Sequence, residues 1–128
     1  MREIIYIGVA GGLGTLGRYY VTGLAHRLLG YGFPYGTLSV NLVGSFLVGF
    51  VAQAGINTGL VPQTLRVPLT LGFLGGFTTF AAFSLETLGY LENGAWSMAG
   101  MNILTNVVPG IIAVLLGVMV GRALLGGT

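Results

Sequence analysis

The segment GFLGGFTTFAAFS, from Gly72 to Ser84, decides the fold because it interrupts an otherwise apolar run of membrane length. It contains the pair Gly75-Gly76, and a glycine inside a helix costs roughly 1 kcal/mol relative to alanine. The pattern fits a broken helix, or an unbroken helix that crosses a neighbour closely. Non-helical backbone persists at membrane depth only where protein buries it or where it lines a cavity. A break would also release backbone carbonyls, which coordinate Na⁺ in some transporters.

The composition indicates the class of protein. Of 128 residues, 54% are hydrophobic and 6% are charged, whereas soluble domains carry about 25% charged residues. We therefore predict an integral membrane protein with a single domain over residues 1–128. The net charge of +2 is too small for a nucleic-acid surface, and without cysteine the chain forms no disulfide or thiolate metal site. The sequence contains no nucleophile–base–acid set or phosphate-binding loop, so we expect no enzymatic activity.

Four segments are long and apolar enough to cross a membrane as helices, which takes about 20 residues each. They cover approximately residues 4–24, 36–55, 66–91 and 96–125. Strands of a membrane barrel would be about half as long, so the predicted fold class is all-α with four transmembrane helices. Four packed helices fill their own centre with side chains. We therefore expect the functional site at an interface between copies of the chain.

The arginines do not fix the orientation in the membrane. Arg2, Arg66 and Arg122 lie on the side of the termini, and Arg18 and Arg27 lie toward the other side. An excess of Lys and Arg normally marks the cytoplasmic loops, and here the two sides are nearly balanced. Two alternatives follow: the chain inserts one way with a weak bias, or it inserts both ways and pairs with its own inverted copy.

Glycines recur four residues apart in three of the expected helices, as Gly8 and Gly12, Gly72 and Gly76, and Gly117 and Gly121. This small-xxx-small spacing lets helix backbones approach closely. We expect most of the 24 glycines to serve packing rather than chemistry.

Polar residues form two stripes with helical spacing. The first consists of Thr37, Asn41 and Ser45, and the second of Asn102, Asn106 and Gly110. Residues four apart lie on one face of a helix. Asparagine in a membrane helix commonly bonds a neighbouring helix, and the alternative is a polar track for a permeating solute. Amide and hydroxyl donors carry no full charge, which suits an anion that must be bound and then released.

Arg18, the pair Phe80 and Phe83, and Glu86 each allow two interpretations. A charge inside a span costs several kcal/mol unless it pairs, faces water or reaches the interface. Arg18 is therefore an interfacial anchor or a positive charge at the mouth of an anion pathway. Phe80 and Phe83 share one helical face, where their rings contact lipid or offer positive edges to an anion. Glu86 bonds a neighbouring helix or shapes a vestibule.

Three motifs occur in the same order as in the CrcB/Fluc family of fluoride channels, which the chain resembles over nearly its whole length. They are GGLGTLGRY from residue 11, GTLSVNLVGSF from residue 36 and GFLGGFTTF from residue 72, followed by Phe83, Ser84 and Glu86. The resemblance implies a fluoride-selective channel in a bacterial inner membrane. Efflux through it would be passive, driven by the electrochemical gradient.

The resemblance also implies an assembly and a set of site residues. The assembly is a homodimer of inverted protomers, with the third helix of each broken near its middle and two fluoride pathways at the interface. The implied fluoride pathway consists of Thr37, Asn41, Thr79, Phe80, Phe83, Asn102 and Asn106. Backbone carbonyls of Gly75 and Thr78 would hold a central, non-transported Na⁺. Arg18 and Glu86 are expected to serve as vestibule or structural charges.

The chain departs from the family pattern at Ala81 and Ala82. The family usually reads Thr-Thr-Phe-Ser-Thr-Phe-Ser here, so this chain lacks two hydroxyls beside the aromatic pair. Lower throughput is expected if those hydroxyls help to bind fluoride. One rival function is a small dual-topology multidrug or metabolite exporter, which needs a titratable membrane site, a role for which only Glu86 qualifies. The other is a non-transporting membrane subunit, which would leave both polar stripes without a role.

Overall fold

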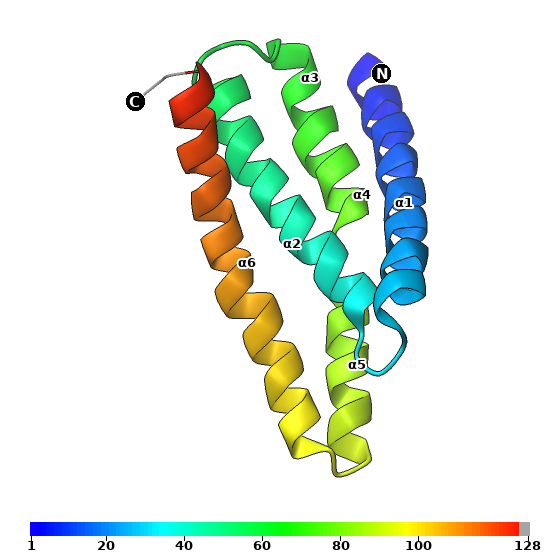
Figure 1. Ribbon diagram of the computed structural model, residues 1–128. Coiled ribbons are helices and arrows are strands. Elements are labelled where there is room, and N and C mark those ends of the chain that lie inside the picture. Colours follow the sequence, from blue (N-terminus) through cyan, green and yellow to red (C-terminus); the bar gives the residue numbers. More distant parts are fainter. Residues whose placement is uncertain (126–128) are drawn as a thin grey trace.

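The computed structural model describes residues 1–125, and every regular element in that range is a helix. The elements in chain order are α1 (Arg2–Leu29), α2 (Tyr35–Phe50), η1 (Val51–Ile56), α3 (Gln63–Val67), η2 (Pro68–Leu74), α4 (Gly75–Phe77), α5 (Ala81–Glu92) and α6 (Trp96–Leu125). The start of α1 and the end of α6 lie at the same end of the bundle (Figure 1). The described part of the chain therefore has the predicted all-α class.

Three helical runs are long and apolar enough to cross a membrane. They are Tyr35–Ile56, Gln63–Glu92 and Trp96–Leu125, with mean hydropathies of 1.6, 1.4 and 2.4. The spans predicted at residues 36–55, 66–91 and 96–125 lie within these three runs. The span predicted at residues 4–24 lies in α1, which has 28 residues but is less apolar than α2 or α6. The count of four spans therefore stays a prediction.

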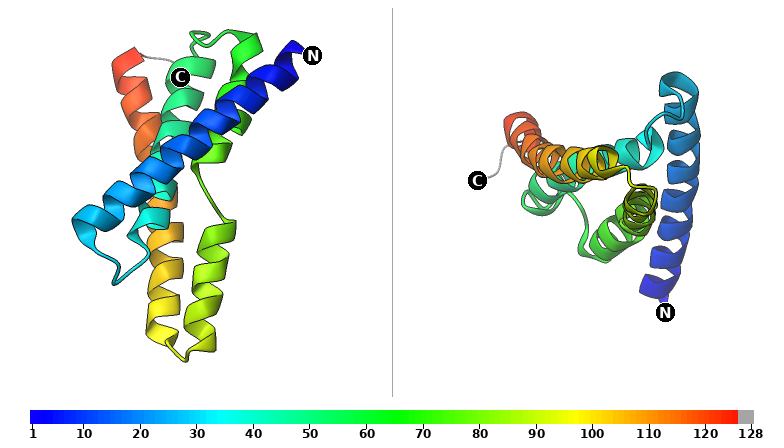
Figure 2. Two further views of the ribbon diagram at one scale, coloured as in Figure 1. Left: turned by 90° about the vertical axis from the view of Figure 1, so that its right-hand side faces the viewer. Right: turned by 90° about the horizontal axis from the view of Figure 1, so that it is seen from below.

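The run Gln63–Glu92, which is the third long helix of the chain when α1 is counted, is broken near its middle. Helix continues through α3, η2 and α4 as far as Phe77, and it resumes at Ala81. Thr78 between them is extended, with φ −86° and ψ 162°, and Figure 2 shows the thin connection to α5. Gly75 and Gly76 themselves remain helical, so the break begins just after the glycine pair. Gly76 instead permits a close crossing, because an added Cβ would lie 2.6 Å from the carbonyl oxygen of Gly11 in α1.

Glycines also set the closest contacts between the other helices. A Cβ at Gly117 of α6 would overlap the carbonyl of Phe46 in α2, and a Cβ at Gly14 of α1 would overlap the carbonyl of Phe73 in η2. Close packing is thus confirmed for the pairs Gly72 and Gly76, and Gly117 and Gly121. Within the chain, the prediction of close packing is wrong for Gly8 and Gly12, because a Cβ at either position would meet nothing within 4 Å.

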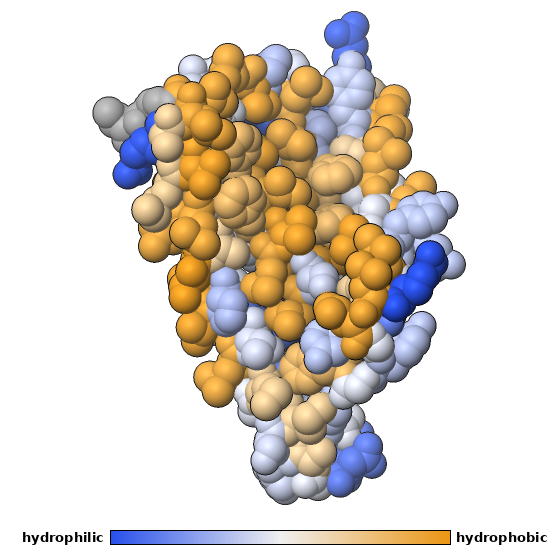
Figure 3. Space-filling view, in the orientation of Figure 1, coloured by the Kyte–Doolittle hydropathy of each residue, from blue (hydrophilic) through white to orange (hydrophobic). Residues whose placement is uncertain are grey.

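The surface of the bundle is largely apolar. Exposed large side chains are frequent on α1 and α6, including Val9, Leu13, Leu16, Leu104, Ile111 and Leu115. Figure 3 shows the hydrophobic surface over α6, α2 and the first half of the third helix, with hydrophilic residues gathered where α5 meets α6. Such a surface requires lipid or another protein chain around it.

Candidate functional site

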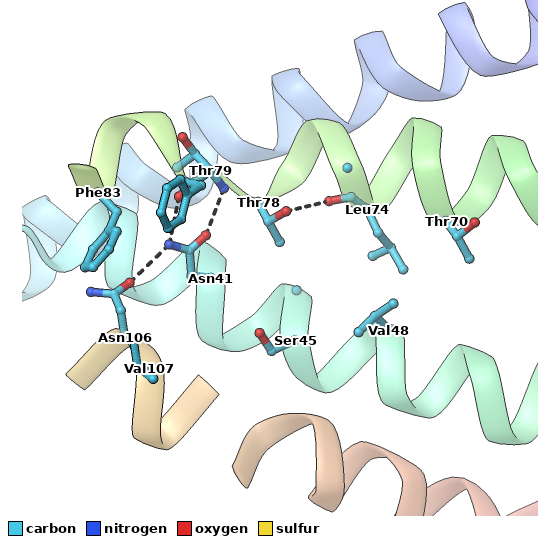
Figure 4. A pocket seen from close by; sticks show the side chains of 13 residues that line it. Asn41, Ser45, Val48, Thr70, Leu74, Thr78, Thr79, Phe83, Asn106 and Val107 are labelled. Carbon is cyan, nitrogen blue, oxygen red and sulfur yellow. Dashed lines mark hydrogen bonds between the residues drawn. The ribbon is translucent and has the colours of Figure 1, made fainter. Parts of the chain in front are cut away.

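The side chain of Asn41, in the middle of α2, binds the backbone at the helix break. Its Nδ2 donates to the carbonyl oxygen of Thr79 at 2.9 Å, and its Oδ1 accepts from the Thr79 N–H at 2.8 Å. This pair of bonds resembles the pairing between two β-strands, and the preceding residue, Thr78, has an extended backbone. Figure 4 shows Asn41 reaching from α2 to Thr79 across the cavity wall. The Asn41 side chain therefore satisfies both backbone polar groups of Thr79, which lies in the helix break.

The break releases backbone carbonyls from their helical donors, and those of Gly75 and Thr78 are among them. In a continuous helix the N–H of residue 79 would donate to Gly75 and that of residue 82 to Thr78. Here the Thr79 N–H donates to Asn41, and the Ala82 N–H donates to Thr79 Oγ1 at 3.2 Å. The carbonyls of Gly75 and Thr78, both in residues that line the adjacent cavity, thus lose the donors that a helix would supply.

A ladder of side-chain amides continues from Asn41 along α6. Asn41 Nδ2 also donates to Asn106 Oδ1 at 3.1 Å, and Asn106 Nδ2 donates to the carbonyl oxygen of Asn102 at 2.9 Å. Asn102 Nδ2 donates to Thr87 Oγ1 at 3.1 Å, whose hydroxyl donates to the Phe83 carbonyl at 2.8 Å. The two predicted polar stripes therefore meet in one hydrogen-bonded network that runs beside the aromatic pair.

An open cavity of about 400 Å³ lies beside the break (Figure 4). Its lining comes from all three of the membrane-length runs: Asn41, Gly44, Ser45, Val48, Thr70, Leu74, Gly75, Thr78, Thr79, Phe80, Phe83, Asn106 and Val107. The cavity thus brings together Asn41, Thr79, Phe80, Phe83 and Asn106 of the predicted fluoride pathway with both residues predicted to hold Na⁺. Apart from backbone groups, its polar lining consists of amides and hydroxyls without a full charge.

Phe80 and Phe83 lie side by side but differ in environment. Their ring centroids are 5.6 Å apart and the ring planes are inclined by 49°. Phe80 lies just before α5 and is 78% exposed, whereas Phe83 in the first turn of α5 is 9% exposed. The shared face predicted from their spacing is confirmed, and one ring of the pair is uncovered in the single chain.

Thr37 and Glu86 form a separate polar contact that does not line the cavity. Thr37 Oγ1 donates to Glu86 Oε2 at 2.6 Å, which joins α2 to α5. The other oxygen, Oε1, is buried and accepts no hydrogen bond, while Asn102 of α6 and His26 of α1 both lie near this carboxylate. Asn102 also lies outside the cavity lining, fully buried at 0% exposure. Three residues predicted from the motifs are therefore adjacent to the cavity residues rather than part of its wall.

Arg18 of α1 bonds the third helix just before the break. Its Nε donates to the Gly76 carbonyl at 3.0 Å, where a positive charge favours the carboxyl end of the first half-helix. The side chain also lines a second open cavity of about 660 Å³ with Tyr19, His26 and Arg27. Arg18 is thus bonded to the third helix but does not line the cavity that contains Asn41.

Sequence reasoning did not identify Thr87 as part of the network. Thr87 is 9% exposed and links Asn102 to the Phe83 carbonyl. The sequence does show that Thr87 lies one helical turn after Phe83. It does not show the contact of Thr87 with α6, because that contact depends on how α5 and α6 pack.

Side chains in the described residues offer no metal site, since no group of three His, Cys, Asp or Glu residues gathers there. A cation near the break would depend on backbone carbonyls. Carbonyl oxygen is a suitable ligand for hard cations, and the Gly75 and Thr78 carbonyls are among those released from helical bonding. The residues present therefore fit a small hard cation at the break.

Comparison with known proteins gives consistent matches along the chain. The family described as "CrcB-like protein, Camphor Resistance (CrcB)" matches residues 5–118. A protein of Geobacter sp. (strain M21) named "Fluoride-specific ion channel FluC" is 47% identical over 124 residues, covering 97% of this chain and 100% of that protein. Proteins with the same name in Citrifermentans bemidjiense and Pelobacter propionicus are 45% and 42% identical, over 97% and 99% of this chain and 100% and 98% of their own lengths.

Proposed function

The chain belongs to the CrcB-like family, and we propose that it is a fluoride-selective ion channel that works as an inverted homodimer of four-span protomers. The observation that carries this function is the position of the Phe80 and Phe83 rings beside the Asn41 amide in one cavity. Ring edges are electropositive, and the amide supplies an N–H donor. Both attract an anion without a full opposing charge, and conduction needs such a balance between entry and release.

A channel of this kind lowers cytoplasmic fluoride without ATP. Fluoride enters cells from acidic media as HF and ionises inside. A membrane potential of 100 mV, negative inside, favours the exit of one negative charge by about 2.3 kcal/mol. We place the channel in the bacterial cytoplasmic (inner) membrane, where this potential exists. The protein is then an ion channel and not an enzyme.

The open side of the cavity supports a dimer. Phe80 is 78% exposed, and the non-helical backbone of residues 78–80 adjoins it at membrane depth. Backbone of this kind requires protein or a water-filled cavity beside it rather than lipid. A second copy packed on this face would cover the break and enclose a pathway on each side of the interface. The nearly balanced arginines are consistent with the inverted arrangement of the two copies.

A central, non-transported Na⁺ is part of the proposal. Its ligands would be the backbone carbonyls of Gly75 and Thr78 from each copy, because these have lost their helical donors. When bound, Na⁺ would supply a positive charge that draws the broken helices of the two copies together. Arg18 already occupies the intervening Gly76 carbonyl, so Gly76 is left out of the ligand set.

The exporter alternative has less support. Coupled export needs a titratable group in the transport cavity, and Glu86 is bonded to Thr37 outside the lining of the cavity that contains Asn41. No specific observation favours this function over a channel.

Anion efflux from liposomes tests the function. We expect the purified protein to release fluoride rapidly and chloride negligibly after a K⁺ ionophore is added. Phe80→Ile should reduce fluoride efflux while the dimer still forms, whereas Phe46→Ile, in a ring pair on α2, should leave efflux unchanged. Equal release of both anions, or proton-coupled uptake of organic cations, would overturn the proposal.

A further inference from the structure

Asn106 is bonded to the same amide group that an anion would use. We propose that Asn106 Oδ1 and fluoride are alternative acceptors for one N–H of Asn41, so that Asn106 sets the fluoride concentration at which the pathway saturates. This inference rests on the proposed channel function and adds a specific role for one α6 side chain.

The Asn41 amide has no donor to spare in the described structure. A primary amide carries two N–H donors and one carbonyl acceptor. One N–H donates to the Thr79 carbonyl at 2.9 Å, and the Asn41 carbonyl accepts from the Thr79 N–H at 2.8 Å. The remaining N–H donates to Asn106 Oδ1 at 3.1 Å. An anion therefore reaches an Asn41 donor only by replacing one of these acceptors.

Asn106 is the acceptor that can be replaced locally. Its bond to Asn41 is a single contact between two side chains in residues that line the cavity, and Figure 4 shows it on the side of Asn41 that faces α6. Replacing the Thr79 carbonyl would instead separate a two-bond pair and move the backbone of the break. Hydrogen bonds to an ion are stronger than those between neutral groups, so fluoride competes well for the N–H.

Hydrogen bonds to Asn102 fix the orientation of the Asn106 side chain. Its Nδ2 donates to Asn102, at 2.9 Å to the backbone carbonyl and 3.2 Å to Oδ1. These bonds turn the Asn106 carbonyl toward Asn41, and they remain when the bond to Asn41 breaks. Asn106 can thus return to Asn41 as soon as the anion leaves, which favours release.

Single-channel conductance measured over a range of fluoride concentrations tests this role. Asn106→Ala removes the competing acceptor, and a neutral hydrogen bond corresponds to about a two- to tenfold difference in affinity. We expect the half-saturating fluoride concentration to fall by that factor. The maximal conductance should fall in parallel, because a more tightly held ion leaves more slowly. Thr105→Ala is the matched control, since that hydroxyl bonds only carbonyls of α6, at 2.7 Å to Met101 and 3.4 Å to Asn102.

The outcomes separate this inference from the function on which it rests. A lower maximal conductance with an unchanged half-saturating concentration would indicate a purely structural role for Asn106 and overturn the inference. If Asn106→Ala does not assemble, Asn106→Ser keeps a shorter acceptor, and its half-saturating concentration should still lie below that of the natural protein. A natural protein without fluoride conductance would instead refute the channel function itself.

Discussion

Asn41 and Thr79 exchange two hydrogen bonds across the helix break, at 2.9 and 2.8 Å. Through these two bonds, the Asn41 side chain of α2 supplies Thr79 with the backbone partners that an unbroken helix would otherwise supply. The consequence is local: the Thr79 N–H no longer reaches the Gly75 carbonyl, and that oxygen becomes available to another partner. One asparagine therefore stabilises the break and also carries the N–H that donates to Asn106 in the cavity lining.

Loss of the Asn41 amide should both destabilise the protein and reduce fluoride efflux. Asn41→Ala removes the two bonds to Thr79 and the bond to Asn106, and at about 1 kcal/mol for each bond we expect the protein to be about 3 kcal/mol less stable. Fluoride efflux should fall at least about tenfold. Fluoride-electrode recordings from liposomes and thermal unfolding in detergent measure the two effects. Asn57→Ala is the control, because it removes a single bond to Gln53 at the end of η1, 3.2 Å long; normal efflux by Asn41→Ala would contradict the assignment.

Two classes of glycine should respond oppositely to alanine. At Gly14 and Gly117 an added Cβ would overlap a backbone carbonyl of the facing helix, so substitution should push the helices apart and cost about 1–3 kcal/mol. At Gly12 and Gly100 nothing lies within 4 Å, so alanine should be neutral or should stabilise by up to about 1 kcal/mol. Melting temperatures of the four variants in detergent measure the difference, and equal losses at all four positions would refute the packing account.

The length of the apolar runs predicted much of this fold, because a membrane helix needs a long apolar run and little else. The runs at residues 36–55, 66–91 and 96–125 are found within the helices of the structure. The exact position of the break was not predictable from local propensity. Gly75 and Gly76 are poor helix formers yet both remain helical, and Gly76 permits the close crossing with α1, while Thr78 is extended. Packing between segments that are distant in the sequence therefore determines where the helix breaks.

The candidate site shows the same division between pattern and packing. The four-residue spacing predicted that Asn41 lies on a polar face of α2 and Asn106 on a polar face of α6. The bond between them could not be predicted, because it requires α2 and α6 to pack in one particular register. Thr87 entered the network for the same reason. The roles in fluoride and Na⁺ binding came from family resemblance, since the spacing of residues fixes neither ligand, and these roles stay predictions.

Restoring the two missing hydroxyls should raise conduction. The double change Ala81→Ser with Ala82→Thr adds two donors at the start of α5, next to Phe80 and Phe83. If such donors replace part of the water lost by fluoride, flux should increase several-fold, since each hydrogen bond corresponds to about a two- to tenfold effect. Efflux rates at equal protein density measure this, with Ser84→Ala, whose hydroxyl bonds Phe80 O at 2.9 Å in its own helix, as the control. Unchanged flux would show that these hydroxyls are dispensable.

Removal of Na⁺ should separate the two copies of the proposed dimer. When Na⁺ is replaced by N-methyl-D-glucamine, we expect fluoride efflux to stop and the dimer fraction, measured by cross-linking in liposomes, to fall. Thr79→Val sharpens the test because it removes the hydroxyl that accepts from the Ala82 N–H at the start of α5, next to the Thr78 carbonyl. Because the backbone at the break is then held less firmly, half-maximal dimer formation should need about two- to tenfold more Na⁺. Thr105→Val, whose hydroxyl bonds only its own helix, should not change the Na⁺ requirement. A full dimer fraction and full efflux without Na⁺ would show that the carbonyls of Gly75 and Thr78 hold no essential cation.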